Sequence, residues 1–340
     1  FPVSGVGYDF QYRNMGETQN TGFEATINVV AIEKEKYGLN FSFNMGVNKN
    51  RINSLGVMNN FGAATNWASS QIGDDYLIAV GSSLGTMYGY KNDGRYEVSD
   101  FDYVGGKYVL KSGVVATATT LVGDGSSLKP GDMKLKDVNG DGKVDLTDKT
   151  VIGNVNPKST GGFVINGNAY GFDLMAAFNW SIGNDVYNAD KIEFSTATAS
   201  GKYKNLNSTM ADGQRWTNLD PATGQLVTDP TALADLNANT TMWSPYMRTA
   251  VFTDWAVEDA SFLRLNTLTL GYTAPEMFTS KLGVSKLRFY MTASNVFVWT
   301  NYSGSDPEVS TKRKNPLTPG VDSSPYPRSR QMVFGMNLNF

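Results

Sequence analysis

The sequence predicts an all-β protein, specifically a transmembrane antiparallel β-barrel with long extracellular loops. Residues 172–180 alternate strictly and place Phe172, Leu174, Phe178 and Trp180 on one apolar face. Alternation over about nine residues exceeds the ~5 to 6 residues of a typical globular strand and is about what a tilted strand needs to cross a bilayer. This apolar face carries no charged residue, and a basic residue at the bilayer midplane would cost about 2 to 4 kcal/mol.

Seven segments are predicted to be membrane-spanning strands of this kind, and the last of them ends on the aromatic residue Phe340. The fifth segment is predicted to be shifted or to contain a β-bulge. The seven predicted segments are 21–31, 39–48, 162–169, 172–180, 261–272, 286–297 and 330–340.

The connections between these strands alternate between short and long. Short turns on the periplasmic side and long loops on the outside are typical of bacterial barrels, so we expect the C-terminus in the periplasm. Loops as long as 49–161 and 181–260 are usually functional or disordered, and their aromatic content argues against disorder. The short connections are 32–38, 170–171 and 273–285, and the long ones are 49–161, 181–260 and 298–327.

Seven strands do not close a barrel, because two open edges in lipid would leave rows of unsatisfied backbone groups. The chain also begins abruptly at Phe1 with no processing segment. We therefore expect residues 1–340 to be the C-terminal portion of a larger barrel, with the remaining strands upstream.

Composition excludes several function classes. The 340 residues include no Cys and no His, which removes disulfides, the usual zinc sites and every Ser-His or Cys-His catalytic arrangement. We therefore predict no catalytic residues, no organic cofactor and no enzyme activity. The net charge of −3 offers no basic field for nucleic acid. The mean hydropathy of −0.29 and the short apolar runs exclude a transmembrane helix, so membrane insertion would use strands.

One segment, 137–148, fits the calcium-loop template of alternating oxygen ligands. Its Gly142 permits the sharp turn, and Asp148 stands where the template usually has Glu. The alternative is a surface turn held by its own side-chain hydrogen bonds, without metal. The expected ligands of a structural Ca²⁺ are Asp137, Asn139, Asp141, the backbone carbonyl of Lys143, Asp145 and Asp148.

Four aromatic residues of the second long loop, Trp216, Trp243, Tyr246 and Trp255, are candidate contacts to a substrate or partner. Flat aromatic faces suit sugar rings and apolar protein patches. The alternative is that the rings pack the loop against itself. The sequence leaves both interpretations open.

Several motifs in order resemble the C-terminal third of the SusC/RagA-type TonB-dependent outer-membrane transporters of Bacteroidetes. Each motif alone is weak, but the ordered set covers nearly the whole chain. The motifs are Asn20-Thr-Gly-Phe-Glu24, the 131–145 stretch with Val151-Ile-Gly-Asn-Val-Asn-Pro157, Tyr170-Gly-Phe-Asp-Leu174, Gly183-Asn-Asp-Val-Tyr-Asn188, Ala260-Ser-Phe-Leu-Arg-Leu265, Leu270-Gly-Tyr272, Ala293-Ser-Asn-Val-Phe297 and Asp306-Pro-Glu308.

This resemblance implies the last seven strands of a barrel of about 22 strands whose lumen holds an N-terminal plug, and this chain carries no plug. It implies a bacterial outer-membrane location, a SusD-like surface lipoprotein as a lid, and energy supplied by TonB through the missing N-terminal region. The implied function is active import of a large nutrient, either a glycan or a peptide. Two alternatives remain: a passive porin or receptor, and a secreted calcium-dependent glycan-binding adhesin.

Overall fold

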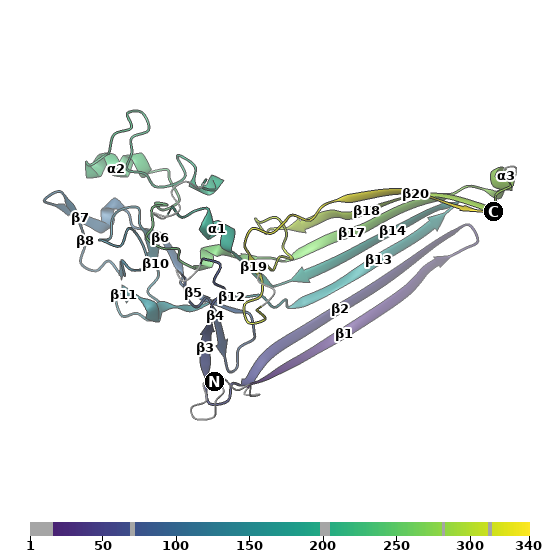
Figure 1. The fold of residues 1–340 in the computed structure, drawn as a ribbon, viewed down its shortest axis with the longest axis horizontal. Coiled ribbons are helices and arrows are strands. Elements are labelled where there is room, and N and C mark those ends of the chain that lie inside the picture. The colour runs from purple at the N-terminus through teal and green to yellow at the C-terminus, as the bar shows by residue number, and fades with distance from the viewer. Residues whose placement is uncertain (1–15, 69–71, 198–204, 281–282, 312–314) are drawn as a thin grey trace, which may run out of the picture.

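The chain was analysed as a computed structural model, which describes residues 16–68, 72–197, 205–280, 283–311 and 315–340. Within these residues, seven long strands form one antiparallel sheet in the order β1-β2-β13-β14-β17-β18-β20 (Figure 1). The strands are β1 Glu17–Glu33, β2 Tyr37–Ser54, β13 Ser159–Ala169, β14 Phe172–Ile182, β17 Phe262–Thr273, β18 Lys286–Thr300 and β20 Gln331–Asn339.

Each of the predicted segments lies on one of these strands. The predicted shift or bulge in 261–272 is also present, because the pairing of β17 with β18 shifts register between Leu265 and Thr267. The first two strands run further than predicted. β2 stays paired with β1 up to Ser54, and its Ile52 is buried in an apolar cluster with the loops.

Strand register gathers the apolar side chains of neighbouring strands on the same face of the sheet. One row runs across five strands through Phe43, Phe163, Phe178, Leu265 and Phe297, each directly opposite the next. The rings of Phe163 and Phe178 stack with centroids 4.4 Å apart. We call this side the apolar face, and many of its large side chains are exposed.

The short turns lie at one end of the sheet, the end that holds the C-terminus (Figure 1). Tyr170 and Gly171 connect β13 to β14 with φ angles of 49° and 88°. Two positive φ angles in a two-residue loop match the twist of a β-hairpin, and Gly171 adopts such an angle without steric penalty. A short helix, α3 Glu276–Thr279, lies in the connection from β17 to β18.

The long connections fold together at the opposite end of the sheet (Figure 1). We call residues 55–158, 183–261 and 301–330 the loop region; its stretches 69–71, 198–204 and 312–314 lie outside the described residues. One buried cluster joins all three connections through Tyr76, Tyr187, Phe252 and Val321. A second contains Met210 and Trp243. The loop region is therefore a folded body with its own core, as its aromatic content predicted.

The secondary structure of the loop region consists of short elements. No helix among the described residues is long and apolar enough to cross a membrane. The strands are β3 Asn60–Ala63, β4 Tyr76–Ala79, β5 Thr86–Gly89, β6 Asn92–Arg95, β7 Phe101–Val104, β8 Lys107–Leu110, β9 Ala116–Thr117, β10 Met133–Leu135, β11 Lys143–Val144, β12 Thr150–Asn154, β15 Asp185–Asn188, β16 Val257–Asp259 and β19 Val321–Asp322. The helices are α1 Ala189–Glu193 and α2 Pro230–Asn237, and the 3₁₀ helices are η1 Val98–Asp100, η2 Leu146–Asp148, η3 Ser208–Met210 and η4 Asp254–Ala256.

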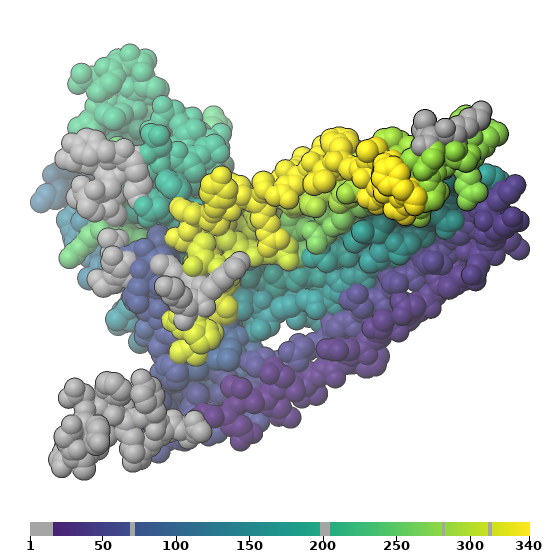
Figure 2. Space-filling model, turned by 45° about the vertical axis from the view of Figure 1, so that its right-hand side comes forward, coloured from purple at the N-terminus to yellow at the C-terminus, as the bar shows by residue number. Residues whose placement is uncertain are grey.

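The two edge strands of the sheet are β1 and β20. In the space-filling view of Figure 2, the purple β1–β2 hairpin and the yellow C-terminal residues lie at opposite edges of the sheet. Each edge strand has one neighbour among the described residues. Closure of the sheet into a larger barrel stays a prediction.

Candidate functional site

The face of the sheet opposite the apolar face is mostly polar and uncharged. The register places Asn40 opposite Asn166, and Asn44 opposite Gly162, which pairs in turn with Asn179. Hydroxyl side chains continue this face on the later strands, where Thr269 and Thr292 are hydrogen-bonded at 3.0 Å. Amides and hydroxyls both donate and accept hydrogen bonds, so this polar face can hydrogen-bond to water or to a polar ligand along its length.

One ion pair on the polar face joins two strands that are not neighbours. Arg288 of β18 donates to Asp173 of β14, with Nη2 to Oδ2 at 2.6 Å and Nε to Oδ1 at 2.9 Å. The strand between them, β17, carries Gly271 at the crossing point, where a Cβ atom would lie 2.4 Å from the Asp173 carboxylate. The missing side chain therefore makes room for a bidentate pair, which is the stronger geometry for arginine and carboxylate.

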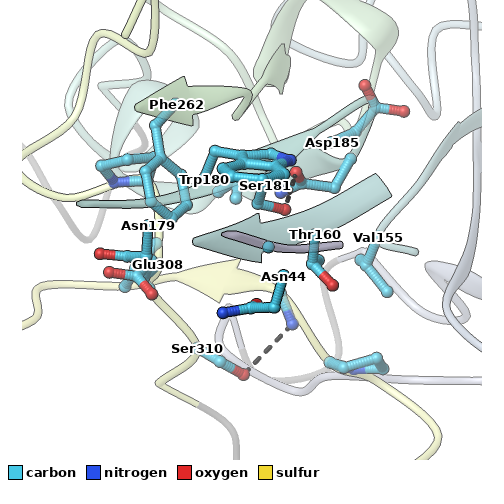
Figure 3. A pocket seen from close by; sticks show the side chains of 17 residues that line it. Asn44, Val155, Thr160, Asn179, Trp180, Ser181, Asp185, Phe262, Glu308 and Ser310 are labelled. Atoms are coloured by element: carbon cyan, nitrogen blue, oxygen red, sulfur yellow. Dashed lines mark hydrogen bonds between the residues drawn. The ribbon is translucent and has the colours of Figure 1, made fainter. Parts of the chain in front are cut away.

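A pocket of about 550 Å³ lies where the polar face meets the loop region (Figure 3). The sheet contributes Asn44, Thr160 and Asn179, and the 301–330 connection contributes Glu308. The Asn179 Oδ1 atom is buried and has no hydrogen-bond partner among the described residues. Burial raises the pKa of Asp185, another lining residue, although its carboxylate accepts a hydrogen bond from the Asn154 backbone at 2.8 Å.

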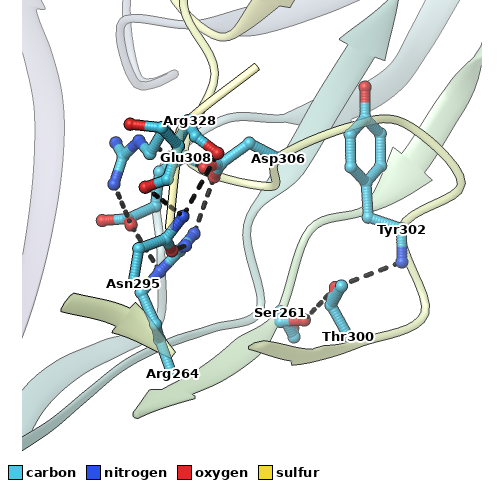
Figure 4. Close-up of polar contacts among 9 residues, drawn as sticks. Ser261, Arg264, Asn295, Thr300, Tyr302, Asp306, Glu308 and Arg328 are labelled. Carbon is cyan, nitrogen blue, oxygen red and sulfur yellow. Dashed lines mark hydrogen bonds and ion pairs between the residues drawn. The ribbon is translucent and has the colours of Figure 1, made fainter. Parts of the chain in front are cut away.

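Close to this pocket, a charged network attaches the 301–330 connection to the sheet (Figure 4). Arg264 is 2% exposed and contacts Asp306 at 2.7 Å and Glu308 at 3.1 Å. Arg328 contacts the same two carboxylates at 3.1 Å and 3.0 Å. Arg264 also donates to Asn295 at 2.6 Å, a residue with a positive φ of 52° beside the register shift. Two cations and two carboxylates thus neutralise one another at the rim of the pocket.

The predicted calcium loop is a compact turn whose side chains accept hydrogen bonds from its own backbone. Asp137 accepts from the Gly140 and Gly142 amides at 2.6 Å and 2.8 Å. Asp148 is 1% exposed and accepts from the Val138 and Asp145 amides, both at 2.8 Å.

The rest of that loop follows the same pattern. Asn139 accepts from the Asp141 amide at 2.9 Å, and Asp141 accepts from the Lys143 amide at 3.1 Å. The Lys143 ammonium lies 2.7 Å from Asp145. The donor set has the all-oxygen chemistry that calcium prefers. Within the described residues, however, no group of three or more acidic side chains is arranged to hold a metal. Calcium binding therefore stays a prediction.

Two of the four predicted aromatic contacts pack against each other in the loop region, one of them buried and the other partly buried. Trp243 is 3% exposed and packs edge-on against Trp255 with ring centroids 5.0 Å apart. The Lys191 ammonium lies 4.4 Å from the Trp255 ring centroid. This arrangement agrees with the alternative that these two rings pack the loop region.

The other two predicted aromatic residues line one pocket at the surface of the loop region. Tyr246 is 69% exposed, whereas Trp216 is 5% exposed. The Arg95 guanidinium lies 4.9 Å from the Trp216 ring centroid, and Gly131 packs against its edge. Of the predicted set, only Tyr246 is largely exposed; Trp243 and Trp216 are buried, and Trp255 is partly buried.

Sequence reasoning missed the charged groups of the site. Arg264 and Arg288 lie in predicted strands at positions that face away from the apolar side, which is the local signal for a functional charge. Their partners Asp173, Asp306 and Glu308 lie far away along the chain. Only the fold brings these charges together.

No protein-family profile matches the chain. The curated relatives that match it are named TonB-dependent receptors. A TonB-dependent receptor of Formosa agariphila is 28% identical over 98% of this chain and 30% of its own length. Another from the same organism is 30% identical over 98% of this chain and 32% of its own length. The TonB-dependent receptor SusC of Bacteroides thetaiotaomicron is 23% identical over 98% of this chain and 28% of its own length.

Among solved structures, the RagAB peptide transporter matches with a TM-score of 0.66 and 21% identity over 98% of this chain and 31% of its own chain. The RagAB importer in its open-open state matches with a TM-score of 0.63 and 20% identity over 100% of this chain. These structural matches show a shared fold. The chain spans about a third of the length of the curated relatives it matches.

Proposed function

We propose that this chain, a relative of the SusC/RagA-type TonB-dependent receptors over nearly its whole length, forms part of the barrel wall of an energy-coupled importer in the bacterial outer membrane. The relatives' names describe receptors and transporters, and we infer no enzyme activity. In this proposal the chain performs no covalent chemistry, and its residues line the path, contact lipid and form the outer surface.

The two-faced sheet is the observation that carries the proposal. Its apolar face exposes large side chains, including Phe172 at 62% and Phe334 at 74%. Exposed apolar area of this extent is unfavourable in water but not in hydrocarbon, where barrel strands alternate between lipid-facing and lumen-facing residues. The polar face then lines an aqueous interior, and a plug supplied by the rest of the receptor would fill it.

The loop region supports an outward orientation. Long loops of outer-membrane barrels lie on the extracellular side, and short turns lie in the periplasm. The folded loop region would therefore meet the medium, where a SusD-like lipoprotein lid would close over it. The Arg264 network fixes the 301–330 connection at the entrance of the polar face and would keep the pocket there in a defined shape.

The polar face also bears on the class of cargo. Its neutral amides and hydroxyls suit a ligand rich in hydrogen-bonding groups and without strong net charge. A glycan and a peptide both have this chemistry, and RagAB is described as a peptide importer. We propose a large polar nutrient of one of these two classes.

The alternatives predict different behaviour. A passive porin would conduct ions without TonB, and a secreted adhesin would be soluble without detergent. The exposed apolar face disfavours the adhesin, because a soluble sheet of this size would bury that face against another layer.

The decisive experiment is mild detergent extraction of outer membranes followed by mass spectrometry of the complex that contains this chain. We expect co-purification with the remaining receptor sequence and a surface lipoprotein. In parallel, uptake of labelled oligosaccharides and peptides is measured with and without functional TonB. Recovery of the chain as a soluble monomer, or uptake that is unchanged without TonB, would contradict the proposal.

A further inference from the structure

The loop region contains a second pocket, of about 370 Å³, which the proposed transport path does not use. Its walls come from four separate parts of the loop region: the β7–β8 hairpin, the 124–132 segment, the 215–219 segment with the residues up to Leu233, and Ser244 with Tyr246. The two predicted contacts that line a pocket, Trp216 and Tyr246, both lie here.

Aromatic rings form much of the wall. Tyr103 is 43% exposed, and its ring centroid lies 4.9 Å from that of Tyr108 at an interplanar angle of 50°. Tyr246 is exposed, and Trp216 is held rigidly below by Arg95. Rigid aromatic rings lose little conformational entropy when a ligand binds, and their faces stack on flat, weakly apolar surfaces.

The charged groups of this pocket are mostly paired within the protein. Lys129 pairs with Asp124, and Arg215 lies 2.7 Å from Asp212. The carboxyl of Asp132 is 8% exposed, and burial raises its pKa to about 6. Both cations of the lining are thus paired with carboxylates of the protein, which favours a neutral ligand over an anion.

The wall also offers hydrogen-bonding groups. Asn218, Thr217 and Thr228 add amide and hydroxyl groups to the same lining.

From this combination we propose that the pocket binds a ring of a neutral saccharide, stacked on Tyr246 and hydrogen-bonded through its hydroxyls. A sugar ring has a C–H face for an aromatic ring and hydroxyls around its edge, whereas a purely apolar ligand would leave the polar lining unsatisfied. The site would capture a glycan at the outer surface before it enters the polar face. The inference rests on the proposed function only for this biological role, since binding itself needs no energy coupling.

The test is isothermal titration calorimetry on the intact detergent-solubilised receptor with four neutral hexasaccharides: maltohexaose, cellohexaose, mannohexaose and xylohexaose. A galacturonic acid hexamer serves as the charged probe. We expect saturable binding of at least one neutral probe and a Kd at least tenfold weaker for the charged one. Binding of none of the neutral probes, or equal binding of the charged probe, would overturn the proposal.

Variants localise the binding. Tyr246→Ala is expected to weaken the Kd at least tenfold, and Tyr246→Phe is expected to retain most of the affinity because the ring remains. Tyr326→Ala is the matched control, because Tyr326 is 95% exposed and lies outside the pocket lining. Equal binding by Tyr246→Ala and the control would place the saccharide elsewhere. If TonB-dependent uptake of peptides persists without saccharide binding, this inference fails while the proposed import function stands.

Discussion

The sheet and the loop region use the same kinds of apolar residue in opposite ways. In the loop region Tyr76 and Phe252 are at most 2% exposed, whereas Phe334 of the sheet is 74% exposed. Both regions belong to one chain of ordinary composition, so the difference reflects the surroundings that each region fits. The loop region buries its apolar side chains in its own core, as a protein in water does. The sheet leaves its apolar side chains exposed, which suits an apolar solvent. Lipid is such a solvent.

The two regions also differ in how charges are held. Exposed ion pairs in the loop region contribute little, because water already solvates both partners. The Arg264 network at the junction is different, because its arginine is almost fully buried. The comparison therefore predicts large effects on the sheet and at the junction, and smaller ones within the loop region.

The largest effect is expected from a charge on the apolar face. Ile165→Lys, near the middle of β13, should cost about 2 to 4 kcal/mol and greatly reduce the folded receptor recovered from outer membranes. Asn166→Lys is the matched control, because it is the adjacent residue and faces the polar side. The yield of folded protein in the membrane fraction is the measurement. Equal loss in both variants would contradict the assignment of faces.

The next largest effect is expected at the junction. Arg264→Met leaves the buried Asp306 and the partly buried Glu308 with only Arg328 as a cationic partner, so we expect a loss of about 3 to 5 kcal/mol. Limited proteolysis of the 301–330 connection measures it. Adding Asp306→Asn should restore part of the stability. Lys134→Met, which breaks a 3.8 Å pair with Asp93 nearer the surface, should change stability by about 1 kcal/mol or less. Similar effects of both single variants would show that burial of the junction does not matter.

A smaller effect concerns pH and Asp75. Burial raises the pKa of Asp75 to about 6, although it accepts hydrogen bonds from Thr65. Because the folded pKa lies above the unfolded value, its stabilising contribution is complete below pH ~4 and is lost as pH rises through about 6. The loop region should therefore become less stable between pH 5 and pH 7.5, by about 1.4 kcal/mol.

Asp75→Asn should remove most of this pH dependence, because the amide does not ionise. Thermal unfolding followed by near-ultraviolet circular dichroism at several pH values is the measurement. The exposed Asp102→Asn variant should keep the dependence of the unchanged protein. If the Asp75→Asn variant keeps the original pH profile, another group is responsible for the pH dependence. Asp132, whose pKa is raised in the same direction, would then be tested next.

The smallest effect is expected from calcium. If the 137–148 loop binds Ca²⁺ in the folded state, free calcium about tenfold above Kd should stabilise the folded state by about 1.4 kcal/mol. Protease cleavage within that loop should slow when calcium is added and recover with chelator. Asp141→Ala should abolish the response, whereas Asp220→Ala, which removes a turn-forming carboxylate elsewhere, should preserve it. Identical cleavage with and without calcium would leave the loop as a metal-free turn.

The sequence predicted the sheet well because alternation is a local property. All the predicted segments lie on its strands, and the relationship to TonB-dependent receptors inferred from the motifs is confirmed by the relatives. The interior of the loop region was not predictable in the same way. Its contacts join distant residues, as in the 2.6 Å hydrogen bond from the Trp67 indole to the Tyr187 hydroxyl.

The candidate site was likewise predictable only in part. The polar face follows from alternation, but the network of Arg264, Asp306, Glu308 and Arg328 depends on how the 301–330 connection returns to the sheet. Residue type alone also did not distinguish an interior Trp243 from a pocket-lining Tyr246. Aromatic residues serve both in cores and on surfaces, and the sequence does not give the burial that distinguishes these two residues.

Gly271 has a mechanical consequence. Neighbouring strands of a sheet normally share load through the hydrogen bonds of each adjacent pair. By leaving room above β17, Gly271 lets Arg288 and Asp173 connect the strands on either side of it directly. A force on the polar face at this level would be distributed over three strands, and β17 could not slip lengthwise unless that bridge opened. If the sheet forms part of the proposed barrel, the smallest residue of β17 would thus increase the resistance of its wall to shear.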